Sequence, residues 1–107
     1  MLSLKPGVRI LGLTSQACLI ALVVERIYAK YGADCVVTSG TDGKHGFSSD
    51  HYIGNSLDFR THPLRALNLD PYEIHKEVKA ALGAEFDVIL EFVGTDQEHL
   101  HAEWDPK

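Results

Sequence analysis

The chain has 107 residues, of which 45% are hydrophobic and 23% charged, and its formal net charge is −5 at pH 7. This length suffices for one domain with a single modest core, and these proportions exclude a disordered or fibrous protein. The acidic balance and the scattered lysines and arginines also argue against a protein that binds nucleic acid by neutralising phosphates.

Neither a signal peptide nor a membrane span is predicted. Polar residues interrupt residues 11–31, so no run reaches the roughly 18 to 20 apolar residues that a span needs. Cys18 and Cys35 fall in a predicted helix and a predicted strand, and we expect two reduced, partly buried thiols. We therefore expect a monomeric, single-domain chain, residues 1–107, that is made in the cytoplasm and remains soluble.

The N-terminal part predicts one long helix. Residues 8–13 are short and mixed, and are either a strand or a lead-in. Thr14 or Ser15 provides an N-cap, because a hydroxyl can satisfy the free amides of a first turn. Apolar residues then recur with helical spacing as far as Tyr31, and Gly32 ends the helix.

The middle of the chain predicts two strands around a loop. Residues 34–39 are β-branched and form a short core strand, and the glycine-rich residues 40–48 form a loop. Residues 56–60 alternate, so Asp58 points to the polar face of a half-buried strand. Residues 61–69 are a connector.

The C-terminal part predicts a helix and a hairpin. Asp70 as N-cap and Pro71 at the first helical position begin a helix that Gly83 closes. Residues 86–93 form a strand, 94–97 a turn, and 99–104 an antiparallel last strand. In that last strand His99, His101 and Glu103 share a face. The predicted fold class is α+β, an antiparallel sheet with helices packed on one face.

Three residues have the chemistry of a catalytic zinc site. His51 lies in the approach loop, whereas Asp58 and His101 lie on the polar faces of two strands. Neighbouring strands are about 5 Å apart, so these side chains can converge on one ion. Glu98 precedes the last strand, where its carboxylate can face the metal and carry a proton during amide hydrolysis. One Zn²⁺ ion is the expected cofactor.

These residues resemble the LAS-type zinc peptidases, a family that includes D-alanyl-D-alanine carboxypeptidases, D-Ala-D-Ala dipeptidases and phage L-alanyl-D-glutamate endopeptidases. The family's first motif corresponds to Ser49-x-His51-x-x-Gly54-x-Ser56-x-Asp58, with serine where alanine is usual. Its second motif corresponds to Glu98-His99-x-His101. The similarity spans roughly residues 34 to 104.

The resemblance implies that His51, Asp58 and His101 are the zinc ligands and that Glu98 is the catalytic base, with His99 orienting the intermediate. It also implies a fold like that of the DD-peptidases and the hedgehog signalling domain. Several members use an upstream arginine to stabilise charge on the substrate, and none lies between Asp34 and His51. The candidate substrate-binding residues are Ser49, Lys44, His45 and Arg60.

The expected function is therefore hydrolysis of an amide bond in bacterial peptidoglycan stem peptides, D-Ala-D-Ala or L-Ala-D-Glu, with no separate wall-binding domain. A phage or bacterial wall-processing enzyme would act on the wall, after phage-mediated release in the first case. One alternative is a zinc-stabilised binding or structural module that hydrolyses nothing. Another is a metal-free domain whose histidines are coincidental.

Overall fold

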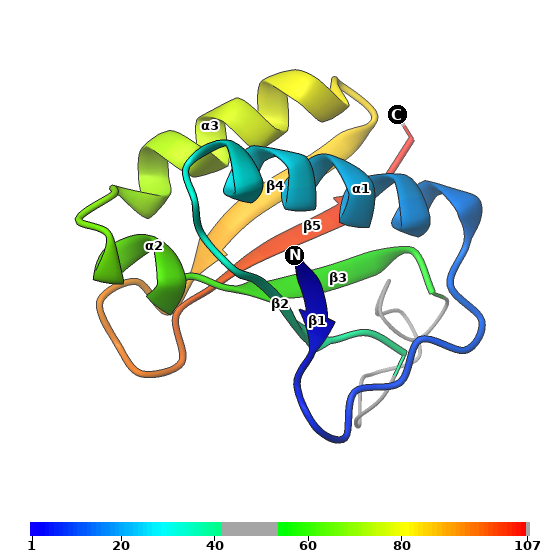
Figure 1. The fold of residues 1–107 in the computed structure, drawn as a ribbon. Coiled ribbons are helices and arrows are strands. Elements are labelled where there is room, and N and C mark those ends of the chain that lie inside the picture. The colour runs from blue at the N-terminus through cyan, green and yellow to red at the C-terminus, as the bar shows by residue number, and fades with distance from the viewer. Residues whose placement is uncertain (42–53, 107) are drawn as a thin grey trace.

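The computed structural model describes residues 1–41 and 54–106. Within these residues the chain forms an α+β fold in which helices pack against a five-stranded sheet (Figure 1). The elements in chain order are β1 (Leu2–Leu4), α1 (Ser15–Lys30), β2 (Cys35–Ser39), β3 (Ser56–Arg60), α2 (His62–Ala66), α3 (Pro71–Leu82), β4 (Phe86–Glu91) and β5 (His99–Trp104). None of the described helices is long and apolar enough to cross a membrane.

The strand order is β1-β2-β3-β5-β4, so β3 lies at the centre of the sheet. The predicted α+β class and the helices on one face are confirmed, but a wholly antiparallel sheet is wrong. β1 pairs parallel with β2, with Leu2 opposite Cys35, whereas the other neighbouring strands are antiparallel. The sheet is therefore mixed, with its one parallel pair at the edge.

Residues 8–13 are the lead-in and not the strand of the two alternatives. Two elements were not predicted. The first is β1, which pairs with β2 through backbone hydrogen bonds that its local sequence does not signal. The predicted connector 61–69 contains α2, a five-residue helix with Pro63 in its first turn. Proline fits there because the first amides of a helix have no intrahelical partner.

The two long helices begin and end as predicted. The Thr14 hydroxyl accepts a hydrogen bond from the Ala17 amide at 3.2 Å and caps α1. The Asp70 carboxylate accepts one from the Tyr72 amide at 3.0 Å and caps α3, which ends at Gly83 with a φ of 93°. Both caps satisfy amides that the helix itself leaves free.

The start of β3 is fixed to the start of α1. The Thr14 amide donates to the carbonyl oxygen of Gly54 at 3.0 Å, and its hydroxyl donates to the same oxygen at 3.2 Å. Gly54 has a φ of 80°, and a Cβ there would lie 2.2 Å from the carbonyl oxygen of Gly12. The glycine is therefore required both by its conformation and by the close approach of another backbone segment.

The core lies between the sheet and the pair α1 and α3. Its largest buried apolar side chains come from both layers: Ile20, Val24, Tyr28, Leu57, Phe59, Leu64, Val78 and Leu100. The buried Tyr28 hydroxyl donates to the Arg60 carbonyl oxygen at 2.9 Å, which ties α1 to the end of β3. Both cysteines are free thiols, as predicted, and Cys35 is buried, but the expected partial burial of Cys18 is wrong, because its side chain is exposed. Burial raises the pKa of the Cys35 thiol to about 12.

Candidate metal centre

The polar residues of the predicted site share the sheet face opposite the helices. Strand alternation places Leu57, Phe59 and Leu100 in the core, and so turns Asp58 and His101 to the other face. In the pairing of β3 with β5, Asp58 lies directly opposite His101. Such opposed side chains have Cβ atoms about 4.5–5.5 Å apart, close enough to bind the same small ligand.

Asp58 and His101 are in direct contact. The Asp58 Oδ1 and His101 Nδ1 atoms are 2.8 Å apart, and the two side chains are only 13% and 12% exposed. The other ring nitrogen of His101, Nε2, lies 3.0 Å from Glu103 Oε1. A histidine with one nitrogen toward a metal position and the other bound by a carboxylate is a common arrangement at zinc sites, because the carboxylate fixes the ring and its tautomer.

His99 and Glu91 extend this group toward the edge of the sheet. Glu91 lies opposite His99 in the pairing of β4 with β5, and its Oε1 is 2.8 Å from His99 Nε2. His99 Nε2 is also 3.5 Å from Asp58 Oδ2, and its Nδ1 is 2.9 Å from the Gln97 carbonyl oxygen. Because oxygen acceptors face both nitrogens, the ring can donate to both only when both nitrogens carry a proton.

The side chains of Asp58, Glu91 and His101 form a group that could hold a divalent ion. One ligand atom from each lies within 4.8 Å of the others, and His101 Nδ1 is 3.9 Å from Glu91 Oε1. Two ligand atoms bound to the same tetrahedral zinc are about 3.4 Å apart, from zinc-ligand bonds of about 2.0–2.1 Å. Shifts of about half an ångström would therefore convert the Asp58–His101 contact into a shared ligand pair.

Sequence reasoning missed Glu91 and did not assign a role to Glu103. Alternation along β4 places Asp87, Ile89 and Glu91 on one face, which the sequence alone could have indicated. That this face meets His99 depends on the register of the hairpin, which the eight-residue separation does not specify.

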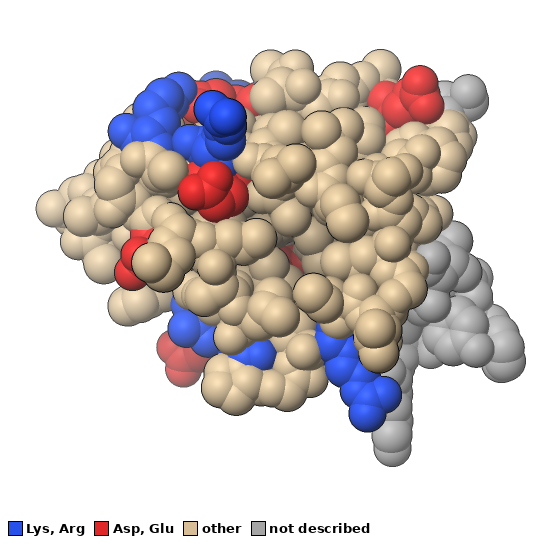
Figure 2. All heavy atoms as spheres, turned by 45° about the vertical axis from the view of Figure 1, so that its right-hand side comes forward, with Lys and Arg blue, Asp and Glu red and all other residues tan. Residues whose placement is uncertain are grey.

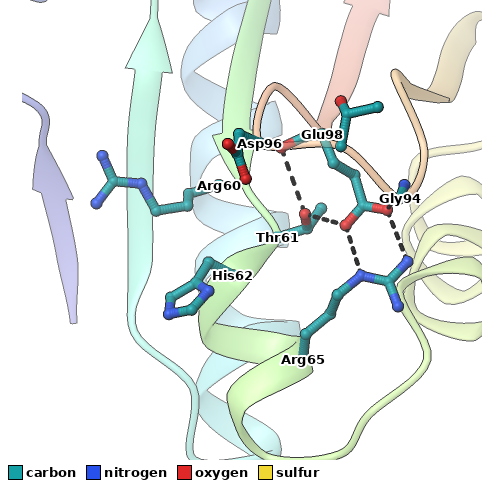
Figure 3. Close-up of a pocket in the computed structure, with 8 residues that line it drawn as sticks. Arg60, Thr61, His62, Arg65, Gly94, Asp96 and Glu98 are labelled. Carbon is teal, nitrogen blue, oxygen red and sulfur yellow. Dashed lines mark hydrogen bonds and ion pairs between the residues drawn. The ribbon is translucent and has the colours of Figure 1, made fainter.

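Glu98 faces α2 and not the Asp58–His101 pair (Figure 3). Its Oε1 accepts from Thr61 Oγ1 at 2.5 Å and from Arg65 Nε at 2.8 Å. Its Oε2 accepts from Arg65 Nη2 at 2.6 Å and from the Gly94 amide at 3.0 Å. The prediction that the Glu98 carboxylate faces the metal position is therefore wrong for this structure. The catalytic role of Glu98 stays a prediction.

These contacts change the acidity of Glu98. The side chain is 4% exposed, and its hydrogen bonds with Arg65, then with Thr61 and Gly94, lower its pKa to about 2 although burial opposes this. A carboxylate with so low a pKa is a weak acceptor of protons near neutral pH. The ion pair also joins the turn between β4 and β5 to α2.

The remaining predicted site residues divide into two groups. His51, Ser49, Lys44 and His45 lie outside the described residues. Arg60 is described: it follows Asp58 by two positions on the same face of β3 and lies opposite His99. The structure therefore brings together Asp58, His99 and His101 from the predicted set, and adds Glu91 and Glu103.

Figure 2 shows one face of the molecule, on which basic and acidic side chains lie close together in small groups and the rest of the described surface is neither Lys, Arg, Asp nor Glu. Within the described part of the chain, a second group of possible ligands, Asp87, Glu103 and Asp105, consists of carboxylates alone.

Comparison with protein-family models, with curated proteins and with solved structures finds no match to this chain. Its function is therefore inferred from its own residues and their geometry.

Proposed function

We propose that this chain is a zinc-dependent peptidase that hydrolyses an amide bond in peptidoglycan stem peptides. The observation that carries the proposal is the contact of Asp58 Oδ1 with His101 Nδ1 at 2.8 Å, with Glu103 on the far nitrogen of the same ring. Both residues occupy the motif positions at which the sequence predicts zinc ligands. His51, outside the described residues, is the predicted third ligand.

Each part of the site has a distinct proposed role in amide hydrolysis. Zinc, when bound, polarises a carbonyl group and makes a water molecule more acidic. Glu103 holds the His101 ring in position, and the largely buried Asp58 supplies a negative charge beside it. His99 donates to Glu91 from the side of the open sheet face, where a substrate carbonyl would enter.

Two carboxylates compete for the proton-transfer role. The spacing of the second motif favours Glu98, but its oxygens are engaged by Arg65, Thr61 and Gly94. Glu91 has Oε1 in contact with His99 at 2.8 Å, but it is better placed, because Oε1 is 3.9 Å from His101 Nδ1 and the side chain is 40% exposed. The contacts therefore support Glu91 as the group that carries the proton.

One observation favours the alternative of a structural zinc module. If Glu91 binds the metal together with Asp58, His101 and the predicted His51, four protein ligands close the coordination shell and leave no position for water. In that case zinc would contribute folding energy alone.

A set of variants separates these possibilities. Purified protein is incubated with peptidoglycan, with and without chelator, and released fragments are identified by mass spectrometry while bound zinc is measured by elemental analysis. Under the peptidase proposal, Glu91→Gln retains zinc and loses hydrolysis, His101→Ala loses both, and Glu73→Gln, an exposed carboxylate paired with Lys76 on α3, retains both.

The same experiment contains its refutation. Stoichiometric zinc without any release of fragments would overturn the peptidase and support the structural module, and absence of zinc would overturn both. Loss of hydrolysis in Glu98→Gln alone, with Glu91→Gln active, would return the proton-transfer role to Glu98.

A further inference from the structure

Two adjoining cavities lie beside the site, at the end of β3. The first, of about 300 Å³, is bordered by Asp58 and His99, by Thr38 and Ser39 of β2, and by Lys5. The second, of about 590 Å³, runs along α2 and the turn between β4 and β5. Arg60, Asp96 and Glu98 line both, so the cavities meet at Arg60.

Arg60 differs from the other arginine at this site. Arg65 is paired with Glu98 through two hydrogen bonds. Within residues 1–41 and 54–106 the Arg60 guanidinium makes no hydrogen bond or ion pair, although its backbone is fixed by Tyr28 and by pairing with β5. Figure 3 shows its side chain extending from β3 across β2, away from Glu98 and Arg65.

The surroundings of Arg60 favour an anionic ligand. Lys5 is held beside β2 by a backbone hydrogen bond from its amide to the Val37 carbonyl oxygen, and its side chain lines the first cavity with the hydroxyl residues Thr38 and Ser39. Three carboxylates also line this cavity: Asp58 contacts His101, Glu98 is paired with Arg65, and Asp96 is the third. A guanidinium binds a carboxylate with two parallel hydrogen bonds, which matches its planar geometry better than any other common anionic group in a peptide.

We propose that Arg60, assisted by Lys5, binds a carboxylate of the substrate on the leaving side of the scissile bond. This inference rests on the proposed function and deepens it. Residues two apart on a strand are about 7 Å from each other, and an extended peptide advances about 3.3–3.6 Å per residue. With the carbonyl at Asp58 and His101, the carboxylate of the next residue lies about 3.3–3.6 Å further along, between Asp58 and Arg60, where the long Arg60 side chain can reach it.

The chemistry of the substrate class follows from this placement. The residue that supplies the leaving amine must carry a free α-carboxylate, as the terminal residue of a D-Ala-D-Ala peptide does and as D-Glu does when it is linked through its side chain. An internal bond in an ordinary protein lacks this group, because the carboxylate is consumed in the next peptide bond. Arg60 thereby makes the site selective against ordinary polypeptide chains.

The test compares peptide analogues that differ only in this carboxylate. Analogues of acetyl-D-Ala-D-Ala and of acetyl-L-Ala-D-Glu with its γ-carboxyl blocked as an amide, each with a ketomethylene group in place of the scissile amide, are prepared with the α-carboxylate free or amidated. Their affinities for the zinc-loaded protein are measured by calorimetry. At least one free-acid analogue should bind at least about tenfold more tightly than its amide. This ratio corresponds to the free energy of a hydrogen bond to a charged group.

The variants assign this preference to Arg60. Arg60→Gln should reduce it to about twofold or less, and Arg60→Lys, which keeps the charge without the planar fork, should give an intermediate value. Arg26→Gln removes a charge from α1 on the opposite side of the sheet and should retain the full preference. Circular dichroism confirms that each variant is folded.

The outcomes also separate this inference from the proposed function. Equal binding of acid and amide by the wild type, or a preference that survives Arg60→Gln, overturns the carboxylate site even if amide substrates are hydrolysed. An Arg60-dependent preference without hydrolysis of the corresponding amides supports the carboxylate site and overturns the peptidase.

Discussion

Replacing Glu98 with glutamine should destabilise the protein at neutral pH and much less in acid. In the folded state the contacts with Arg65, Thr61 and Gly94 lower the pKa of Glu98 from 4.5 to about 2. That difference corresponds to about 3 kcal/mol at about 1.36 kcal/mol per pKa unit. Because the Arg65 side chain is 48% exposed, solvent screens part of it, and we expect a loss of about 2 kcal/mol.

The pH dependence follows from the sign of the shift. A folded-state pKa below the unfolded value contributes stability that is fully present above pH 4.5 and is lost as the pH falls toward 2. The difference in unfolding free energy between wild type and Glu98→Gln should therefore be constant from pH 7 to about pH 5 and shrink below it. In a domain of this size the neutral-pH difference corresponds to a fall in Tm of about 10 °C.

The assay is urea unfolding of metal-free protein followed by circular dichroism at several pH values. Glu73→Gln, which removes an exposed carboxylate from α3, is the matched control and should change the unfolding free energy by less than about 0.5 kcal/mol. If Glu98→Gln is as stable as the control at pH 7, or if its deficit is the same at all pH values, the ion pair does not hold this carboxylate. Glu98 would then be free to transfer protons.

Three further contacts have measurable consequences. Glu103→Ala should weaken zinc binding about 10- to 100-fold in competition with a chromophoric chelator, and unchanged affinity would contradict its role behind His101. Gly54→Ala should cost about 2 kcal/mol or more in urea unfolding, clearly more than Gly32→Ala, where φ is also positive but no atom lies within 4 Å of the added Cβ. Thr14→Ala should lower the unfolding free energy by about 1 kcal/mol through loss of the cap, whereas Thr14→Ser should be nearly neutral.

The parts of the fold that the sequence predicted are those with local causes. The cap residues Thr14 and Asp70 and the closing Gly83 define both long helices, because each acts on backbone groups within four residues. Alternation likewise placed Asp58 and His101 on the polar face. β1 was missed because three residues of an edge strand are held by pairing with β2 and not by their own pattern.

The candidate site was predictable as a set of residue types but not as a set of contacts. The motif spacing brought Asp58 and His101 together correctly. The ion pair of Glu98 with Arg65 joins residues 33 positions apart, and Arg65 lies on α2, a helix that was not predicted. The sequence therefore did not indicate which groups the Glu98 carboxylate would contact. Glu91 reaches the site through the hairpin register, which is a property of the turn between β4 and β5.

The central position of β3 determines which strands would exchange their amide hydrogens more slowly when metal binds. β3 and β5 each have a strand on both sides, so their amides exchange hydrogen with solvent only when much of the sheet opens. An ion held by Asp58 and His101 binds the closed state alone, and so would make those openings rarer in proportion to its affinity. Zinc would therefore lengthen the exchange lifetimes of the innermost strands together, while the edge strand β1 would continue to exchange at its own rate.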